Sequence, residues 1–146
     1  MSGGLVYSKF RIYRLDDRDL DEVEPAPVDF LGSGLQRMVG IGIDEPACQM
    51  VFEDFFPGGR YDWTTWQDQV DLVTRGKAEI TCLLPPALEE KVVVIAEAPC
   101  VYLIPRGTRI TWRVLGDEIF RHISIDFPNP WFPSMPARSV REAAGG

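Results

Sequence analysis

Residues 57–76 read PGGRYDWTTWQDQVDLVTRG, and this stretch decides the fold. The paired glycines at its start allow a tight turn, and the polar residues in its middle allow a bend. On either side of the bend lie runs rich in aromatic and β-branched residues, which favour strands. The stretch ends at Gly76, directly before another strand-forming run. It therefore predicts two short strands that are joined by a bend and closed by a glycine turn, as in a β-barrel.

The rest of the chain repeats this pattern of short strands. Turn residues such as Asp44-Glu45-Pro46 and Pro85-Pro86 divide the strand-forming runs. These runs cover residues 35–43, 48–56, 62–66, 70–74, 78–84, 92–96, 101–104, 108–115 and 119–126. One short helix is expected near Asp16, where an acidic segment suits a helix N-terminus. Many short strands with hardly any helix favour an all-β sandwich or a closed barrel.

Composition limits the classes of protein that this chain can belong to. A chain of 146 residues is long enough for one domain with a single core. Its net charge of −7 argues against a nucleic-acid partner, because phosphate binding needs a concentrated basic surface. No run approaches the roughly 20 apolar residues that span a membrane, and no signal-peptide segment opens the chain. Cys48, Cys82 and Cys100 lack disulfide or metal spacing, so we expect buried thiols and a cytoplasmic location.

A second motif surrounds Pro105-Arg106-Gly107, within IPRGTRITW at residues 104–112. Three further features accompany this motif. They are Trp63, the spacing between Asp71 and Gly76, and the end of the last predicted strand at Phe127-Pro128, which Trp131 follows. Over about half of the chain, these features resemble the cupin superfamily. Within that superfamily they resemble the branch of ethanolamine-utilization protein Q and the ureidoglycine-aminohydrolase-like domains.

The resemblance implies an all-β, small single-domain cupin barrel, also described as a double-stranded β-helix or jelly roll. We expect residues 46–133 to form the barrel and residues 1–45 to form an N-terminal arm with covering strands. Residues 134–146 are expected to be a flexible C-terminal tail. The resemblance also implies a homodimer, because small barrels of this family tend to pair through outer strands.

The metal site of the family is the main point of departure. Metal-using cupins carry two His and one Glu in the first motif and one His in the second. The resemblance places these positions at Trp63, Thr65 and Gln69 and near Ile110, which are not ligands that zinc, iron or manganese accept. The chain has a single histidine, His122. We therefore expect no metal and no cofactor, although an unconventional site built from Glu53, Asp71 and His122 stays open.

Two residues are candidates for acid–base catalysis. Asp71 lies between Val70 and Leu72, so it is either a buried carboxyl with a perturbed pKa or a solvated strand end. His122 lies in FRHISID, where alternate side chains share a face. If its face points inward, the barrel gains a polar wall that can move a proton. If the isoleucines point inward, His122 is a surface or interface residue.

Further residues are candidates for contacting a ligand. The predicted substrate-binding residues are Tyr61, Trp63, Gln69, Trp112 and Glu53. Aromatic rings such as Trp63, Trp66 and Trp112 suit the mouth of a small-molecule site, but core packing explains them equally well. The face of Glu53 is ambiguous from the pattern, and Tyr61 can equally close the turn after the glycine pair.

Three classes of function remain open. The first is a metal-independent enzyme (isomerase, lyase or hydrolase) acting on a small polar or aromatic metabolite, with Asp71 and His122 as acid and base. The second is a non-catalytic ligand-binding or accessory protein of a catabolic operon. The third is a structural dimerisation module. We favour the first two together, with a small molecule as partner and neither nucleic acid nor membrane.

Overall fold

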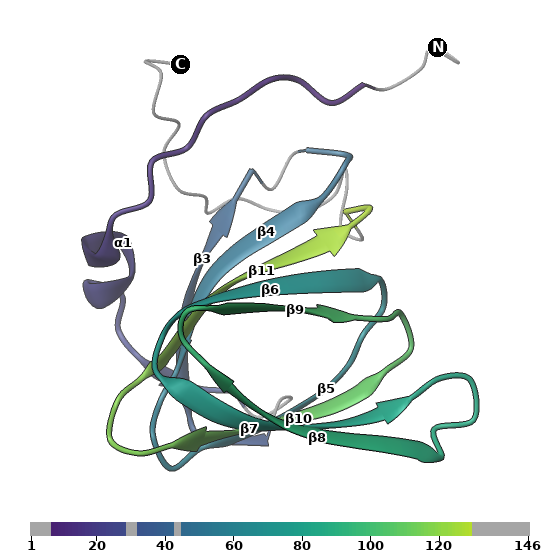
Figure 1. The fold of residues 1–146 in the computed structure, drawn as a ribbon. Helices are drawn as coiled ribbons and strands as arrows, with labels where there is room; N and C mark the ends of the chain where they lie inside the picture. Colours follow the sequence, from purple (N-terminus) through teal and green to yellow (C-terminus); the bar gives the residue numbers. More distant parts are fainter. Residues whose placement is uncertain (1–6, 29–31, 43–44, 130–146) are drawn as a thin grey trace.

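A computed structural model describes residues 7–28, 32–42 and 45–129. Two antiparallel sheets face each other, and the short helix α1 lies outside β3 and β4 (Figure 1). The first sheet has the order β1 (Ala26–Pro27), β3 (Leu35–Ile41), β4 (Gln49–Phe55), β11 (Phe120–Phe127), β6 (Asp68–Arg75) and β9 (Cys100–Ile104). The second has the order β2 (Gly32–Ser33), β5 (Arg60–Thr64), β10 (Arg109–Leu115), β7 (Lys77–Leu84) and β8 (Glu90–Glu97). The expected all-β architecture is confirmed.

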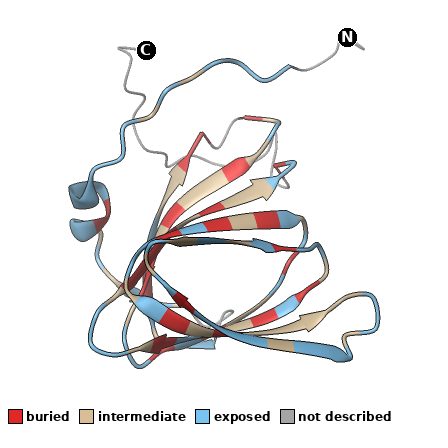
Figure 2. Ribbon diagram, viewed as in Figure 1, coloured by how far each residue is buried: buried red, intermediate tan, exposed pale blue. Residues whose placement is uncertain are grey.

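The core lies between the two sheets because apolar residues alternate along the strands. In β10, for example, the buried Ile110, Trp112 and Val114 alternate with the exposed Arg109 and Arg113. The buried core consists of Phe55, Tyr61, Val73, Ala78, Ile80, Ala96, Ile104, Ile110, Trp112, Val114 and Phe120. Buried segments recur along β4, β11 and β6, whereas β8 is mostly exposed (Figure 2). The face of each strand that joins this core is called the inner face below.

Gly76 is the only residue between β6 in the first sheet and β7 in the second. Its φ of +80° lies in the left-handed region, which glycine adopts without strain. A Cβ at this position would also collide with the backbone carbonyl of Ile119. The glycine that closes the decisive sequence stretch therefore permits the chain to pass from one sheet to the other.

The N-terminal arm covers part of the outer face of the first sheet. Helix α1 (Asp17–Asp21) begins at Asp16, whose side chain forms a reciprocal capping box with Asp19. The predicted short helix near Asp16 is therefore confirmed. Its single buried residue, Leu20, packs with Ile41 of β3 and Phe52 of β4 in a second apolar cluster.

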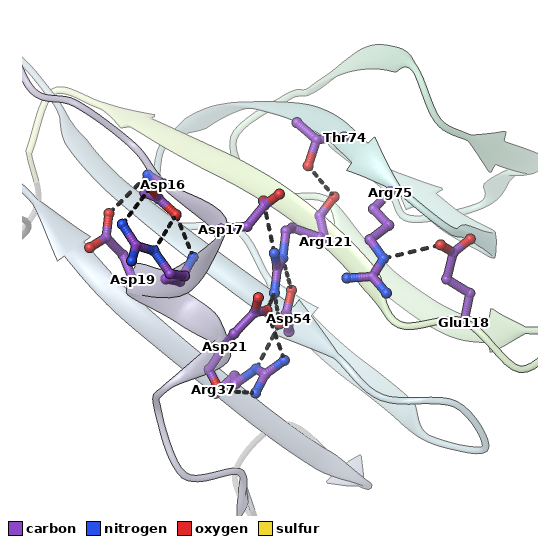
Figure 3. Close-up of polar contacts among 11 residues, drawn as sticks. Asp16, Asp17, Asp19, Asp21, Arg37, Asp54, Thr74, Arg75, Glu118 and Arg121 are labelled. Carbon is purple, nitrogen blue, oxygen red and sulfur yellow. Dashed lines mark hydrogen bonds and ion pairs between the residues drawn. The ribbon is translucent and has the colours of Figure 1, made fainter.

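An ion network fastens α1 to the sheet (Figure 3). The guanidinium of Arg121 is 1% exposed and donates to both carboxylate oxygens of Asp54 at 2.8 Å. It also contacts Asp17 and Asp21 of α1, at 2.9 and 2.6 Å. Arg37 donates to Asp54 at 2.7 Å. Because every donor meets a carboxylate, a buried arginine is tolerated on the outer face of β11.

Some strand limits differ from those that the sequence predicts. A strand is predicted at 62–66, but β5 spans Arg60–Thr64. The reason is that Thr65 leaves the strand to hydrogen-bond the turn after β9: its hydroxyl donates to the carbonyl of Pro105 at 2.9 Å and accepts from the amide of Thr108 at 3.0 Å. Trp131, the predicted tail at 134–146 and the predicted strand end at residue 43 lie outside the described residues. Among the described helices, none is long and apolar enough to cross a membrane.

Candidate functional site

A row of polar side chains runs along the inner face of the first sheet. Strand register places His122 opposite Glu53, and Ser124 opposite Asp71. Asp126 follows, opposite both Gln49 and Gln69. The opposite face of β11 carries Arg121, Ile123 and Ile125, and Ile123 packs in the outer apolar cluster. Both faces of β11 are thus covered, with the polar set facing the core. We call the residues Glu53, Asp71, His122, Ser124 and Asp126 the inner polar row.

The buried end of the row is an ion pair. The imidazole Nε2 of His122 lies 2.8 Å from the carboxylate Oε1 of Glu53, and His122 is fully buried. The amide of Gln36 contacts the other carboxylate oxygen of Glu53. The rings of Phe55 and Phe120 lie 5.0 and 5.2 Å from the imidazole, between centroids. The imidazole is therefore held by a carboxylate on one side and by apolar rings around it.

Asp71 lies on β6, diagonally across from His122 on β11. Diagonal neighbours on adjacent strands are typically about 7–8 Å apart. Asp71 is fully buried, so it is not a solvated strand end. Its Oδ1 accepts a hydrogen bond from the amide of Gln69 at 2.9 Å. The hydroxyls of Ser124 and Tyr102 also approach the Asp71 carboxyl. Among the described residues, neither Oδ2 of Asp71 nor Nδ1 of His122 has a partner with normal hydrogen-bond geometry. Buried polar atoms without partners are uncommon in proteins, and such atoms suit a missing ligand or water.

The pKa of His122 reflects two opposing effects. Burial alone lowers the pKa, because an apolar environment disfavours the charged imidazolium. The hydrogen bond and the negative charge of Glu53 act in the opposite direction, with help from Asp71 and Asp54. The net result is a pKa above the ordinary value of 6.5. The carboxylate of Glu53 thus favours the protonated, charged form of His122.

The two aspartates of the row have raised pKa values. Burial raises the pKa of Asp71 above 3.8. The nearby charge of His122 and hydrogen bonds from Gln69, Ser124 and Tyr102 offset only part of this rise. Burial also raises the pKa of Asp126, to about 7, and the charges of Asp71 and Glu53 add to it. Asp126 is half-buried, so it lies where the row approaches solvent. Asp126 is therefore a carboxyl of the row that exchanges its proton near neutral pH.

Tyr102 of β9 lies beside the inner polar row, because β9 pairs with β6 on the side away from β11. It lies opposite Asp71 in the strand register, and its hydroxyl accepts a hydrogen bond from Trp112 Nε1 at 2.9 Å. Burial raises the pKa of Tyr102 strongly, and the charge of Asp71 raises it further. Tyr102 thus stays neutral and links the indole of the second sheet to the carboxyl of the first.

The remaining predicted ligand-contact residues have different surroundings. Tyr61 is 1% exposed, stacks on Phe55 and donates from its hydroxyl to the carbonyl of Leu35 at 2.6 Å. Its polar atom is therefore already used in folding. Trp63 is half-buried at the edge of the core, and its ring stacks on the exposed Trp66 with centroids 5.6 Å apart. Trp112 and Gln69 lie at the inner polar row, as described above.

The residues that the sequence resemblance places at metal positions have side chains that do not suit a metal ion. The hydroxyl of Thr65 is engaged with the Pro105–Thr108 turn, and the amide of Gln69 donates to Asp71. Ile110 is fully buried in the apolar core, and Trp63 packs against this core. None of these side chains offers a carboxylate, imidazole or thiolate. Within the described part of the chain, no group of three or more His, Cys, Asp or Glu side chains is placed to hold a metal ion.

Two surface clefts lie away from the inner polar row. One, of about 440 Å³, lies beside the turns around Gly76 and Gly116. The other, of about 380 Å³, lies between the N-terminal arm and the outer face, where Ile41, Met50 and Leu72 form an apolar floor. The inner polar row differs from both because its fully buried Asp71 and His122 each carry an unpartnered polar atom. We therefore treat the row as the candidate site.

Sequence reasoning missed Tyr102 and Gln36. Tyr102 alternates with Cys100 and Ile104 in a short strand, where an aromatic residue is an ordinary core residue. Gln36 lies in the segment for which the sequence offered no motif. Ser124 and Asp126 share the face of His122 by simple alternation, so the pattern did predict them once the direction of His122 was known.

Comparison with known proteins supports the fold. Neither a protein-family model nor a curated protein sequence matches the chain. Among solved structures, a cupin-like protein from Thermotoga maritima is 24% identical, with a TM-score of 0.61 over 82% of this chain and 87% of that one. A putative ethanolamine utilization protein Q (EutQ) from Salmonella typhimurium is 19% identical, with a TM-score of 0.56 over 75% of this chain and 82% of that one.

A EutQ protein from Clostridium difficile is 23% identical, with a TM-score of 0.52 over 68% of this chain and 66% of that one. The expected small, all-β cupin barrel and its likeness to EutQ proteins are thereby confirmed at the level of the fold. The chain folds as a cupin-like jelly roll.

Proposed function

We propose that the chain binds a small polar or aromatic metabolite against the inner polar row and transfers a proton to or from it without a metal ion. The observation that supports this most directly is the pair of buried, unpartnered atoms, Asp71 Oδ2 and His122 Nδ1. They lie on adjacent strands and on the same face. A ligand that bonded both atoms would remove the cost of leaving them unpaired.

The proposed chemistry uses the opposing pKa effects at the two residues. Glu53 holds His122 through Nε2, so only Nδ1 is available to give or take a proton. Burial favours the neutral form of Asp71, so that carboxyl is available as a proton donor or, once ionised, as a base. A histidine and a carboxyl with raised pKa values, both beside one ligand, suit an isomerase, lyase or hydrolase. Trp112, through Tyr102, would fix the position of the ligand beside Asp71.

The test is a thermal-shift screen of small carboxylates, amines, alcohols and phenols on metal-free protein. Compounds that stabilise the wild type are then tested on Asp71→Asn, which keeps the side-chain shape, and on Asp117→Asn, an exposed control. The proposal expects stabilisation to be lost in Asp71→Asn and kept in the control. Compounds that stabilise both variants as well as the wild type would contradict it. Turnover is followed by proton NMR in D2O, where proton transfer at carbon replaces C–H signals.

A second candidate is a non-catalytic ligand-binding or accessory protein of a catabolic operon. It is favoured by the likeness to EutQ proteins, one of which is described as a putative ethanolamine utilization protein. The same screen separates the two candidates. A ligand that binds through Asp71 but shows no exchange and no product at any pH from 6 to 9 would support the accessory role over the enzyme.

We also propose that two copies of the chain pair through the outer face of β6 and β9. Strand register forms two apolar rows there, one through Val101, Leu72 and Ile123 and one through Leu103, Val70 and Ile125. Val101 and Leu103 are 62% and 65% exposed. An exposed apolar sheet face can be complementary to itself, as a twofold dimer requires. A cytoplasmic location remains part of the proposal, because Cys48, Cys82 and Cys100 are free thiols.

A further inference from the structure

The charges that face the core have one sign, apart from His122. Three carboxyl groups lie on the inner face of the first sheet: Glu53 on β4, Asp71 on β6 and Asp126 on β11. Glu53 is already paired with His122 and Gln36. Asp126 has no cationic partner among the described residues, and the positive charge that acts on Asp71 is that of His122, which Glu53 already pairs. Two carboxyl groups are therefore left for an ionic ligand.

The cationic side chains of the strands lie elsewhere. Arg37 and Arg121 bind Asp54 on the outer face. The other strand cations are exposed, and they are Arg60, Arg75, Lys77, Lys91, Arg109 and Arg113. Within the described strands, no lysine or arginine is thus available to bind a carboxylate or phosphate at the inner polar row. An anionic ligand there would meet like charge without compensation.

Aromatic residues line the same region. Phe55 and Phe120 flank His122, and Trp112 reaches the row through Tyr102. Aromatic rings attract cations to their faces. Carboxyl groups without cationic partners, combined with rings, are the chemistry that recognises an organic ammonium ion. An unpartnered and fully buried Asp71 oxygen points to the same class, because an N–H donor would satisfy it.

We propose that the inner polar row takes a small organic cation, an alkyl- or arylammonium ion, with Asp71 and Asp126 as its counter-charges. This inference rests on the proposed function, since it names the class of ligand for the same site. Asp126 is the partly exposed member, between Gln49 and Gln69, so the cation meets it first. Asp71 lies one step further along the inner face and would receive the ammonium N–H.

Binding of a cation is expected to release a proton. Because the pKa of Asp126 is raised to about 7, this carboxyl is largely protonated at pH 6. An ammonium ion beside it favours the carboxylate, so the proton passes to the buffer while the ammonium keeps its own. The charged groups that act on Asp126 are Asp71 of β6 and Glu53 of β4, and His122 shares its face of β11. Glu53 and Asp71 both add negative potential for a cation.

The experiment uses two series of compounds, each with an amine, an alcohol and a carboxylate on the same carbon skeleton. The aromatic series is benzylamine, benzyl alcohol and benzoate. The aliphatic series is propylamine, 1-propanol and propanoate. Affinity is measured by calorimetry at pH 6 and pH 8 in two buffers of different ionisation enthalpy. The imidazole resonance of His122, the single histidine, reports whether a compound reaches the row. We expect an amine to bind about tenfold more tightly at pH 8 than at pH 6, which follows from ionisation of one carboxyl of pKa about 7. Proton release is expected at pH 6.

Variants separate this inference from its alternatives. In Asp126→Asn the pH dependence of amine binding should disappear, whereas the exposed Asp117→Asn should retain it. If benzoate, propanoate or an alcohol moves the His122 resonance while neither amine does, the cation inference is wrong and the proposed site stands. If no compound of either series moves that resonance, both the inference and the site are contradicted. If an amine binds at the row but is not converted, the inference stands. Only the catalytic part of the proposed function is then contradicted.

Discussion

His122 is the only imidazole of the chain, so its titration reports directly on the inner polar row. We predict that it titrates above pH 6.5 in the wild type, and below pH 6.5 in Glu53→Gln, where burial is no longer opposed by the carboxylate. The pair therefore stabilises the fold below about pH 6.5, and this contribution is lost as pH rises through the folded-state pKa. NMR titration measures both values. Glu90→Gln, an exposed control on β8, should leave the titration unchanged. Equal titrations in wild type and Glu53→Gln would contradict the ion pair.

Asp126 gives a second prediction at this scale. Its pKa rises from 3.8 to about 7 on folding, so between these values the unfolded chain binds fewer protons and stability falls as pH increases. Asp126→Asn should therefore gain stability over the wild type, and the gain should grow by on the order of 2 kcal/mol between pH 5 and pH 8. Urea unfolding at the two pH values measures it, with Asp117→Asn as control. A variant that loses stability at pH 8 would exclude a buried, protonated Asp126.

The sequence predicted some of these residues and not others, for physical reasons. Asp71 could be singled out because a carboxyl between Val70 and Leu72 has few explanations other than a buried or a terminal position. The direction of His122 could not be predicted, because both faces of β11 are covered and Arg121 is buried through an ion network. That network depends on Asp54 and on α1, which are distant in the sequence.

Among the elements, the β6–β7 passage at Gly76 is the most constrained. Gly76 and Gly58 have almost the same φ, +80° and +81°, so an alanine is strained at either position. Only at Gly76 does a Cβ also meet backbone, the carbonyl of Ile119, whereas at Gly58 nothing lies within 4 Å. We predict that Gly58→Ala costs about 1 kcal/mol and that Gly76→Ala costs at least roughly 3 kcal/mol. Chemical denaturation compares the two. Equal losses would show that the passage between the sheets is not tightly packed.

The first and last residues of the strands show which boundaries the sequence pattern predicts and which it does not. The strands β4 and β10 were predicted to within one residue at each end, because their apolar residues alternate or cluster between clear turns. The prediction for β5 was displaced, since Thr65 continues a strand-like pattern but hydrogen-bonds a turn 40 to 43 positions away. The short strands β1 and β2 lacked any signal, because pairing alone defines them.

At the scale of the whole molecule, the apolar rows on β6 and β9 predict the oligomeric state. Leu103→Glu places a charge in the centre of the proposed interface and should convert a dimer to a monomer, because burying an unpaired carboxylate is costly. Val93→Glu on β8, also exposed and apolar, should remain dimeric. Light scattering after size-exclusion chromatography measures the mass. A wild type that is monomeric at 100 µM would exclude this interface.

The fold could be predicted from turns, alternation and two glycine-closed motifs, because a jelly roll depends on short-range patterns that recur along the chain. The site could be predicted only in part, because a polar row forms from strands that are adjacent in the sheet and distant in the sequence. Glu53, Asp71 and His122 come from three different strands, β4, β6 and β11. Their meeting depends on sheet order, which the sequence alone does not specify.

The most direct test follows the His122 imidazole in protein that elemental analysis shows to be free of transition metal. Small metabolites are added while the resonance is recorded, first on the wild type and then on Asp71→Asn. The account predicts that at least one compound shifts the resonance in the metal-free wild type and leaves it unmoved in the variant. Ligand binding that requires a stoichiometric metal ion, or that never reaches His122, would contradict it.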